Sequence, residues 1–428
     1  MNLTSLLVAV LTAQPSPVET EPAPAPQAAG MTLAEAVRVA LANHPDLAVA
    51  NAQTAIAQAR IEQTKAPLRP TLDGTATAGA QGTEPPDFFD PAVSARVSVS
   101  LGWLVTDFGR TQARQRQARL GIDSADVGVA LTQQALVELV EVTWFEALAR
   151  DQLITVVEAS VAAEERHLGE AERLVKVGVK PSFDVAQAKT QLALARTQLA
   201  RAKGDARLAR ARLAQAMGAE AATIDGPLAG GWPAAEPGED EAVTTLLAEA
   251  VGQRPDARAA DLSVRATELA IATAEHGLNP TLSVGAELGA QATEAGLGAG
   301  WGASVTLRWP ILDGGLTDAQ VDEARAERVA ADKDKLALIL RIRTEIAAAQ
   351  EAIRSARAQR EAAVASRAIA EEALRLAEAR YAQGLSSGIE LADALANVVL
   401  TGADSVSAEW SLASARASLR ASLGRGPR

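Results

Sequence analysis

The sequence predicts a mainly α-helical fold with a small β part, in which long antiparallel helical hairpins are joined to four strands. The first observation is that 111–177 and 317–383 read as uninterrupted helices, each roughly 100 Å long at about 1.5 Å per residue. The second is that segments between helices alternate apolar and polar residues with the period of two that marks strands. The third is that the whole pattern occurs twice.

The two halves of the chain carry the same pattern at a nearly fixed spacing. Gly178 and Gly384 are 206 positions apart, as are Asp184 and Glu390. Earlier in the chain, 70-PTLDG matches 280-PTLSVG at a spacing of 210. The only length change therefore falls in the strand region, where loops vary. One register kept over such a distance indicates an internal duplication.

The duplication divides the chain into a first repeat at 31–225, a linker at 226–240, a second repeat at 241–424 and a tail at 425–428. Each repeat contains a helix with a proline near its start, a β-hairpin, a long helix and a returning helix. The predicted segments are 32–66, 71–103, 111–177 and 183–217 in the first repeat, and 243–277, 281–309, 317–383 and 389–423 in the second.

Residues 1–30 read as a signal-like segment followed by a Pro/Ala-rich tether. The apolar run from Leu6 to Leu11 is too short to span a bilayer, and Ala13 offers a small residue for cleavage. The alternating Pro, Ala and Glu of 15–26 predict an extended tether. A plain disordered tail is the alternative. No later stretch of 18 or more apolar residues predicts a transmembrane helix.

Composition narrows the function. A net charge of −12 and a pI near 5.0 argue against nucleic acid as a partner. Cysteine is absent, so there is no disulfide framework, thiolate metal site or lipid-anchored cysteine. No nucleotide, zinc or nucleophile motif is present, so we expect no enzyme, cofactor or metal site. His44, His167 and His276 are interpreted as ordinary surface or packing residues.

The strands have one apolar and one polar face. In the first hairpin, strands near 71–80 and 95–103 are expected, and in the second, strands near 281–290 and 301–309. The apolar positions of the second and fourth strands are Ala95, Val97, Val99, Leu101 and Trp103, and Trp301, Ala303, Val305, Leu307 and Trp309. The glycines at 296, 298, 300 and 302 are interpreted as a turn and the start of a strand.

Four such strands fit either a small soluble sheet or part of a transmembrane barrel. A barrel needs about eight strands or more, so four per chain imply oligomerisation, and three chains would supply twelve. Trp103 and Trp309 end their strands at one level and Trp301 begins one at the other, as in an aromatic girdle. Both features favour a trimeric, twelve-stranded barrel.

The junctions between strands and long helices are also duplicated. Asp107 and Asp313 precede Gly109 and Gly315 in 106-TDFGRT-111 and 312-LDGGLT-317. Glycine permits a tight reversal and aspartate caps a helix, so we expect a structural role.

Heptad repeats indicate that the long helices pack against neighbours. In the first repeat the outgoing positions are Val140, Ala147, Ile154, Val161, Leu168 and Val175, and the returning ones are Val185, Leu192, Leu199, Ala206 and Leu213. Alanine elsewhere on these helices allows close approach on further faces, as a wall of helices requires.

These elements, with the tip motifs 178-GVKPSFDV-185 and 384-GLSSGIEL-391, resemble the TolC family of outer-membrane efflux proteins over residues 31–424. The resemblance implies a homotrimer in the outer membrane of a Gram-negative bacterium. Its twelve-stranded barrel would continue as a twelve-helix tunnel in the periplasm. The implied function is a passive efflux duct whose partners are outer-membrane lipid, a periplasmic adaptor protein and an inner-membrane transporter.

The resemblance also assigns residues. The adaptor-docking tips would be Gly178, Val179, Lys180, Pro181 and Ser182, and Gly384, Leu385, Ser386 and Ser387. Glu390 and Asp393 match acidic rings at the entrance, and Asp184 and Tyr381 match a pair that ties neighbouring hairpins in the closed state. Ser386 stands where the type member has an arginine, so the closed entrance is expected to rest on fewer charge pairs.

Two alternatives stay open on the sequence. The duct could serve type I protein secretion, since similar ducts serve drug efflux, metal efflux and secretion alike. A soluble coiled-coil scaffold would explain the heptads, although it leaves the duplicated amphipathic hairpins and the tryptophans unexplained. The sequence does not identify the exported compound or the class of inner-membrane pump.

Overall fold

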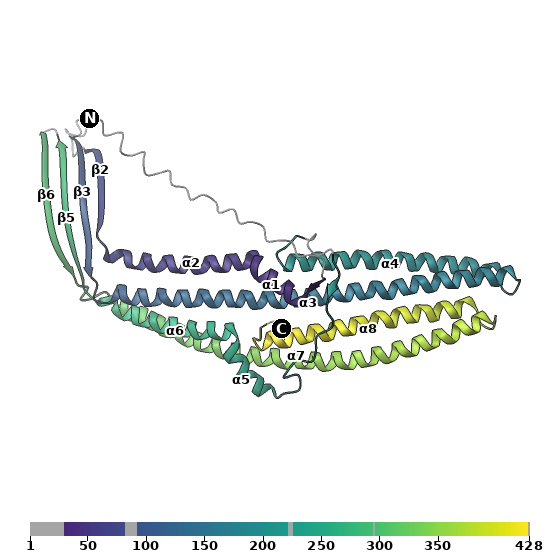
Figure 1. The fold of residues 1–428 in the computed structure, drawn as a ribbon. Helices are drawn as coiled ribbons and strands as arrows, with labels where there is room; N and C mark the ends of the chain where they lie inside the picture. Colours follow the sequence, from purple (N-terminus) through teal and green to yellow (C-terminus); the bar gives the residue numbers. More distant parts are fainter. Residues whose placement is uncertain (1–29, 82–91, 221–225, 294–295, 427–428) are drawn as a thin grey trace.

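The computed structural model describes residues 30–81, 92–220, 226–293 and 296–426. The signal-like segment and tether expected within residues 1–29 therefore lie outside the described part. The protein is mainly helical with a small sheet, as the sequence predicts. The sheet stands at one end of an elongated body, and long helices run away from it to two hairpin tips at the other end (Figure 1).

The two halves have the same order of main elements. The first contains β1 (Met31–Thr32), α1 (Leu33–Asn43), α2 (Pro45–Lys65), the 3-10 turn η1 (Ala66–Leu68), β2 (Thr71–Gln81), β3 (Ala92–Thr106), α3 (Arg110–Lys176) and α4 (Ser182–Ala216). The second contains β4 (Leu228–Ala229), α5 (Val243–Gln253), α6 (Pro255–Glu275), the 3-10 turn η4 (His276–Leu278), β5 (Thr281–Thr293), β6 (Gly296–Arg308), α7 (Leu316–Ala382) and α8 (Gly388–Ser422). Helices α3 and α7 have 67 residues each, and α4 and α8 have 35 each.

Proline interrupts the first helical segment of each half. Pro45 and Pro255 are the first residues of α2 and α6, and the residues before them, His44 and Arg254, are extended. Proline disfavours helical backbone in the preceding residue but fits the first helical position. The His44 side chain accepts a hydrogen bond from the Asp46 amide at 3.2 Å, which caps the new helix.

The four-stranded sheet is antiparallel throughout, in the order β2-β3-β5-β6. Residues opposite one another share a face, and the register places Val99 opposite Leu288 and Leu288 opposite Trp301. One face is therefore apolar across all four strands. The other is polar, and there Arg96 donates a hydrogen bond to Gln291 at 2.8 Å.

The strand predicted to start at Trp301 begins five residues earlier. The residues between Gly296 and Trp301 form an extended ladder with β5, and Gly298 is opposite Gln291. Glycine weakens a strand, but here the continuous hydrogen-bonded partner strand outweighs that preference. Trp301 therefore lies inside β6, so the prediction that it begins a strand is wrong.

The helices form a strip that repeats the order of the strands. Next to the sheet, α2 packs on α3, α3 on α6 and α6 on α7. Towards the tips, the neighbours are α4, α3, α8 and α7 in that order. In the described residues, the outer sides of α2 and α4 at one edge, and of α7 at the other, have no further helix against them.

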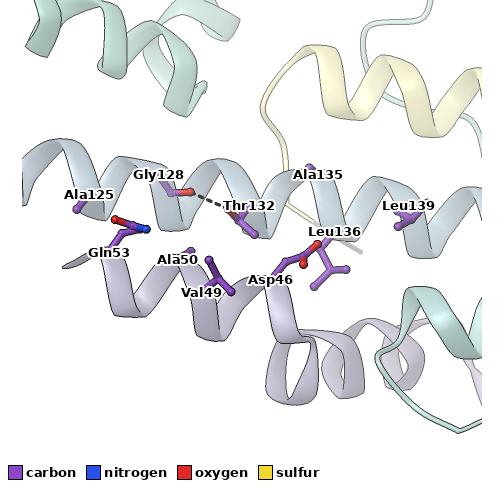
Figure 2. Close-up of a pocket in the computed structure, with 10 residues that line it drawn as sticks. All are labelled: Asp46, Val49, Ala50, Gln53, Ala125, Gly128, Thr132, Ala135, Leu136 and Leu139. Carbon is purple, nitrogen blue, oxygen red and sulfur yellow. Dashed lines mark hydrogen bonds between the residues drawn. The ribbon is translucent and has the colours of Figure 1, made fainter. Parts of the chain in front are cut away.

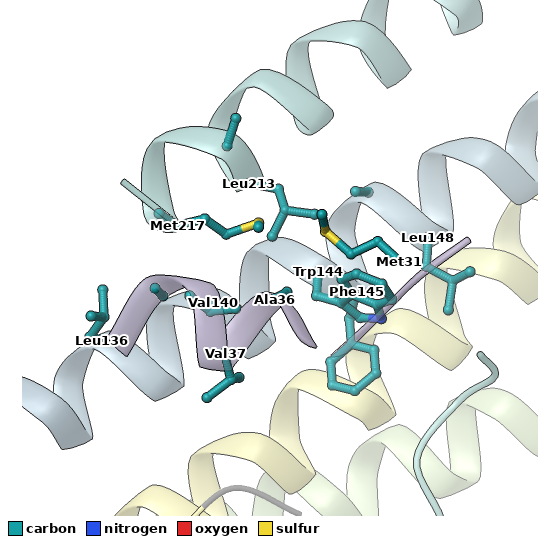
Figure 3. Close-up of a cluster of buried hydrophobic side chains, with 14 of the residues drawn as sticks. Met31, Ala36, Val37, Leu136, Val140, Trp144, Phe145, Leu148, Leu213 and Met217 are labelled. Carbon is teal, nitrogen blue, oxygen red and sulfur yellow. The ribbon is translucent and has the colours of Figure 1, made fainter. Parts of the chain in front are cut away.

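Heptad packing joins α3 to α4, since every heptad position predicted for this hairpin is buried or half-buried. The largest apolar cluster lies where α1 crosses this hairpin (Figure 3). Trp144, Val140 and Leu213 are at most 2 % exposed there. The second half has a corresponding cluster, in which Ile342 and Leu419 are fully buried.

Buried ion pairs hold the linker between the halves to this region. Arg420 of α8 contacts both Glu141 of α3 and Glu236 of the linker, and all three are nearly inaccessible. Arg416 donates to Glu239 at 2.9 Å. Such pairs are costly to break singly because the remaining charge stays buried.

Within the described ranges given above, no helix is both long enough and apolar enough to cross a membrane.

Trp144 carries the first prediction. Replacing Trp144 by Ala should lower the free energy of unfolding by about 3–5 kcal/mol, because a large buried ring is lost and a cavity remains. Denaturant unfolding followed by circular dichroism measures the change. Leu208→Ala is the control: Leu208 is 53 % exposed, so a change near 0.5 kcal/mol is expected. Equal effects of the two substitutions would contradict the described core.

Candidate functional site at the hairpin tips

Both hairpins turn through the same backbone arrangement. Gly178 and Gly384 have φ angles of +81° and +75°. Behind them, the amide of Val179 bonds the carbonyl of Leu174, and the amide of Leu385 bonds that of Arg380. This is the Schellman ending of a helix, which needs a left-handed residue after the cap. Glycine takes that conformation without steric cost, so the shared geometry explains why both tip motifs are centred on glycine.

The two tips touch each other. A Cβ atom on Gly384 would lie 3.2 Å from Val179 Cγ1. Lys180 reaches across, so that its Nζ donates to the Ser386 carbonyl at 2.6 Å and lies 5.3 Å from the centre of the Tyr381 ring. This cation–π contact adds about 0.5–1 kcal/mol or more in a partly buried setting.

Directly behind the tips, Tyr381 of α7 meets Asp184 of α4. The Tyr381 hydroxyl donates to Asp184 Oδ2 at 3.5 Å, and both side chains are buried. Burial, with the nearby Asp184 carboxylate, raises the pKa of Tyr381 to about 12. The phenol therefore stays protonated and can donate at any physiological pH. The structure thus brings together the two residues expected to tie the hairpins.

Ser386 occupies the position at which the type member of the resembled family has an arginine. It is buried, with 6 % exposure. Its hydroxyl has no hydrogen-bond partner among the described residues, while its carbonyl receives Lys180. Basic groups at this tip come instead from Lys180 and from Arg380, whose guanidinium pairs with Glu390 at 2.7 Å. Arg380 was not predicted from the sequence, because the pair joins residues on either side of the turn.

Glu390 and Asp393 lie in the first turns of α8. The Ser387 hydroxyl caps this helix by accepting the Glu390 amide at 3.2 Å. Glu390 is half-exposed and bound to Arg380, whereas Asp393 is exposed. Residues three apart share a helix face, so both carboxylates stand on the same side of α8.

The tips expose an apolar surface. Val179 is 57 % exposed and Leu385 is 68 % exposed. Pro181 and Ser182, which begin α4, are exposed as well. Phe183 and Ile389 are 65 % and 55 % exposed beside them and were not predicted as site residues. The detectable signal was an apolar residue at the equivalent position of each tip motif, where a solvated helix start would be polar.

The three tryptophans predicted to form a girdle lie at the sheet, far from the tips. Trp103 is 42 % exposed, and its indole donates to the Leu68 carbonyl at 3.1 Å. Trp301 and Trp309 are 81 % and 61 % exposed. At the strand-to-helix junctions, Asp107 and Asp313 accept the amides of Thr111 and Thr317 at 2.7 and 2.8 Å, which is the capping role expected for them.

A groove runs between α2 and α3 (Figure 2). It has a volume of about 550 Å³ and is lined mainly by apolar and small side chains: Asp46, Val49, Ala50, Gln53, Ala125, Gly128, Thr132, Ala135, Leu136 and Leu139. Val49 is 60 % exposed and Leu139 is 48 % exposed. In the part of the chain that the structure describes, no group of three or more His, Asp or Glu residues could hold a metal ion.

Comparison with known proteins agrees with this architecture. The family described as outer membrane efflux protein matches residues 36–219 and 246–425. Protein CyaE of Bordetella pertussis is 30 % identical over 357 residues, covering 80 % of this chain and 73 % of its own length. The toluene efflux pump outer membrane protein TtgC of Pseudomonas putida is 25 % identical over 391 residues, covering 86 % and 77 %.

Solved structures share the fold. The outer-membrane channel OprN superposes with a TM-score of 0.72 at 22 % identity and covers 92 % of this chain and 90 % of its own. The open state of the MtrE outer membrane channel of Neisseria gonorrhoeae gives a TM-score of 0.69 at 22 % identity, covering 92 % and 89 %.

The tip glycines carry the second prediction. Gly178→Ala should lower the free energy of unfolding by about 1–2 kcal/mol, because alanine at positive φ is strained, although no atom would clash with its Cβ. Gly169→Ala, inside α3 and equally unobstructed, should instead raise stability by up to about 1 kcal/mol. Denaturant unfolding of both variants measures this. Stabilisation by both substitutions would contradict the left-handed turn.

Proposed function

The chain belongs to the outer membrane efflux protein family, and from this premise we propose that three copies form the passive outer-membrane duct of a tripartite efflux system. A periplasmic adaptor and an inner-membrane transporter would deliver the exported compound. Relatives named as efflux pump outer membrane proteins favour efflux over protein secretion. Family membership also decides against a coiled-coil scaffold. The duct is assigned no catalytic step.

The proposal of a trimer depends on one observation: each of the two outer strands of the four-stranded sheet has an unpaired side. Strands β2 and β6 are the edges of the sheet, and edge strands present free amides and carbonyls that invite pairing. Pairing β6 of one copy with β2 of the next would close twelve strands around three copies. Closure removes every edge. The internal duplication would then place six hairpin tips at the far end.

The helices support the same closure. On α7, Val329, Leu336 and Leu340 are 57 %, 51 % and 56 % exposed, and their spacings of seven and four put them on one stripe. On the opposite edge of the strip, the groove between α2 and α3 exposes Val49 and Leu139 (Figure 2). In the trimer, the α7 stripe of one copy would pack against the edge of the α2–α3 groove of the next copy, directly below the paired strands.

The sheet's apolar face would meet outer-membrane lipid. Val97, Val99 and Leu101 on that face are 40–60 % exposed, the reverse of a soluble protein's burial pattern. The polar face, with Arg96 and Gln291, would line the water-filled interior. Trp103 and Trp309 would lie at one membrane boundary, and the helical part would then form a tunnel in the periplasm.

The tips would receive the adaptor, and the carboxylates would line the entrance. Val179 and Leu385 provide an apolar docking surface beside Gly178 and Gly384. Glu390 and Asp393 from three copies would place six carboxylates around one axis, which favours cations over anions. The pairing of Glu390 with Arg380 would reduce that negative potential while the entrance is closed.

Mass measurement tests the trimer. In mild detergent, the protein from the outer-membrane fraction should have the mass of three 44.3 kDa chains less any cleaved leader, and it should conduct in planar bilayers. Leu336→Asp should shift it towards monomer, since a charge would be buried at the contact. Asp334→Lys, at an exposed site on a different side of α7, should remain trimeric. A wild-type monomer in the soluble fraction would overturn the duct.

Adaptor binding tests the tips. The double variant Val179→Asp/Leu385→Asp should bind the cognate periplasmic adaptor at least about tenfold more weakly, because apolar contacts are replaced by charges that must be desolvated. Biolayer interferometry on the detergent-solubilised full chain measures the affinity. Leu400→Asp, at a leucine that is 59 % exposed on α8 away from the tip, is the control, because α8 already has α3 and α7 as neighbours. Equal affinities of the two variants would place docking elsewhere.

A further inference from the structure

His167 lies one layer behind the contact between the hairpins. It belongs to α3 and is 6 % exposed. Its ring meets the Tyr381 ring edge-on, with centres 4.9 Å apart and planes at 69°. Tyr381 in turn donates to Asp184. The imidazole is therefore packed against a side chain that bonds α7 to α4.

The imidazole has little support for a positive charge. Its Nδ1 atom has no hydrogen-bond partner among the described residues. Neutral histidine has one N–H group that needs an acceptor, whereas imidazolium has two. Burial lowers the pKa of His167, and this effect exceeds the opposing influence of the Asp184 carboxylate. The neutral ring is therefore the form that fits this site.

The surrounding charged groups come from every element packed nearby. They are Glu164 and Glu170 on α3, Lys180 in the turn, Asp184 on α4, Arg380 and Tyr381 on α7, and Glu390 on α8. Glu170 forms an ion pair with Arg173, and Glu390 forms one with Arg380. Lys180 lies over Tyr381 and adds a second positive charge close to the ring.

Glu164, three residues before His167, is a second candidate for a counter-charge besides Asp184. It is 6 % exposed, and its Oε2 has no partner in the described residues. Burial raises the pKa of Glu164, so this carboxyl becomes neutral earlier than usual as the pH falls. It is therefore a weaker source of negative charge in acid than an ordinary glutamate.

We propose that His167 is a positioning residue, which holds Tyr381 against Asp184 while the imidazole is neutral and releases the two hairpins when it is protonated. The inference deepens the proposed function, since the tips would close the entrance of the duct. Protonation would bury a cation that the Asp184 carboxylate compensates only in part, at the contact between α3 and α7. Separation of the tips relieves this by letting water reach the ring.

Because the pKa of His167 is lowered in the closed state, acid favours the separated tips. The contact is fully present above the ordinary imidazole pKa of about 6.5 and is lost as the pH falls through the lower value in the closed state. Between these values, each pH unit shifts the ratio of closed to open tips by up to about tenfold per site. The other histidines, His44 and His276, lie outside the tips, near the break before α2 and at η4.

Spin labels measure the separation. The chain has no cysteine, so Phe183→Cys and Ile389→Cys, at residues 65 % and 55 % exposed, place one label on each tip. In the purified full-length protein in detergent, the fraction with separated tips should rise between pH 7.5 and pH 5.0, with the ratio of open to closed tips changing by up to about tenfold per pH unit below about 6.5. Circular dichroism at both pH values confirms that the helices persist.

Two substitutions remove the titration in different ways. His167→Gln keeps a polar side chain, and His167→Phe keeps a ring against Tyr381. A variant closed at pH 7.5 should stay closed at pH 5.0. His276→Gln and Glu164→Gln are the controls and should retain the wild-type response.

The proposal is overturned if the wild-type tips do not separate in acid, or if a closed His167 variant separates as the wild type does. It is also overturned if both His167 variants are open at pH 7.5, since His167 would then act by packing alone. None of these readings requires conduction or a trimer. A monomeric, non-conducting protein would instead overturn the proposed function, independently of the label distances.

Discussion

The need to pair backbone groups dominates this structure. An open antiparallel sheet of four strands leaves one side of β2 and one side of β6 without partners. The helical part also has two unpartnered edges, because α2 and α7 adjoin the edge strands and each has one side without a neighbouring helix. A soluble domain would cover such edges within one chain. Here the strip keeps the same width from the sheet to the tips, so copies of the chain offer the consistent way to complete it.

The distribution of apolar residues follows from the same constraint. The chain builds its cores where three helices meet, around Trp144 in one half and Ile346 in the other. Elsewhere alanine fills the contacts between paired helices, and much of the larger apolar area stays exposed. Exposed apolar area of this extent normally marks a surface that is covered in the assembled state. The sheet and the α7 stripe are two such surfaces with different expected neighbours, namely lipid and protein.

Much of the fold could be predicted because it depends on local periodicity. The heptad pattern predicted α3 and α4, and the period of two predicted the strands. The tip glycines predicted turns, and the backbone of these turns is left-handed at Gly178 and Gly384. The start of β6 was missed because glycine-rich sequence resembles a turn until its partner strand is known. Arg380 and Phe183 were not predicted at the tips because their surroundings depend on which side chains oppose them across the hairpins. That information is tertiary.

The contact between the two hairpin tips is small and partly polar. Two hydrogen bonds and one cation–π contact join the hairpins here, and each contributes about 0.5–1.5 kcal/mol. A small apolar cluster, in which Leu174 of α3 packs with Leu391 and Leu395 of α8, adds to them. By contrast, α4 packs along α3 and α8 packs along α7 over the whole length of each hairpin. The contact between the hairpins is less extensive than the packing within each one, so the tips can part while both hairpins stay folded. On the proposal made above, protonation of His167 would weaken the polar part of this contact, and the apolar cluster would set how much of the contact remains.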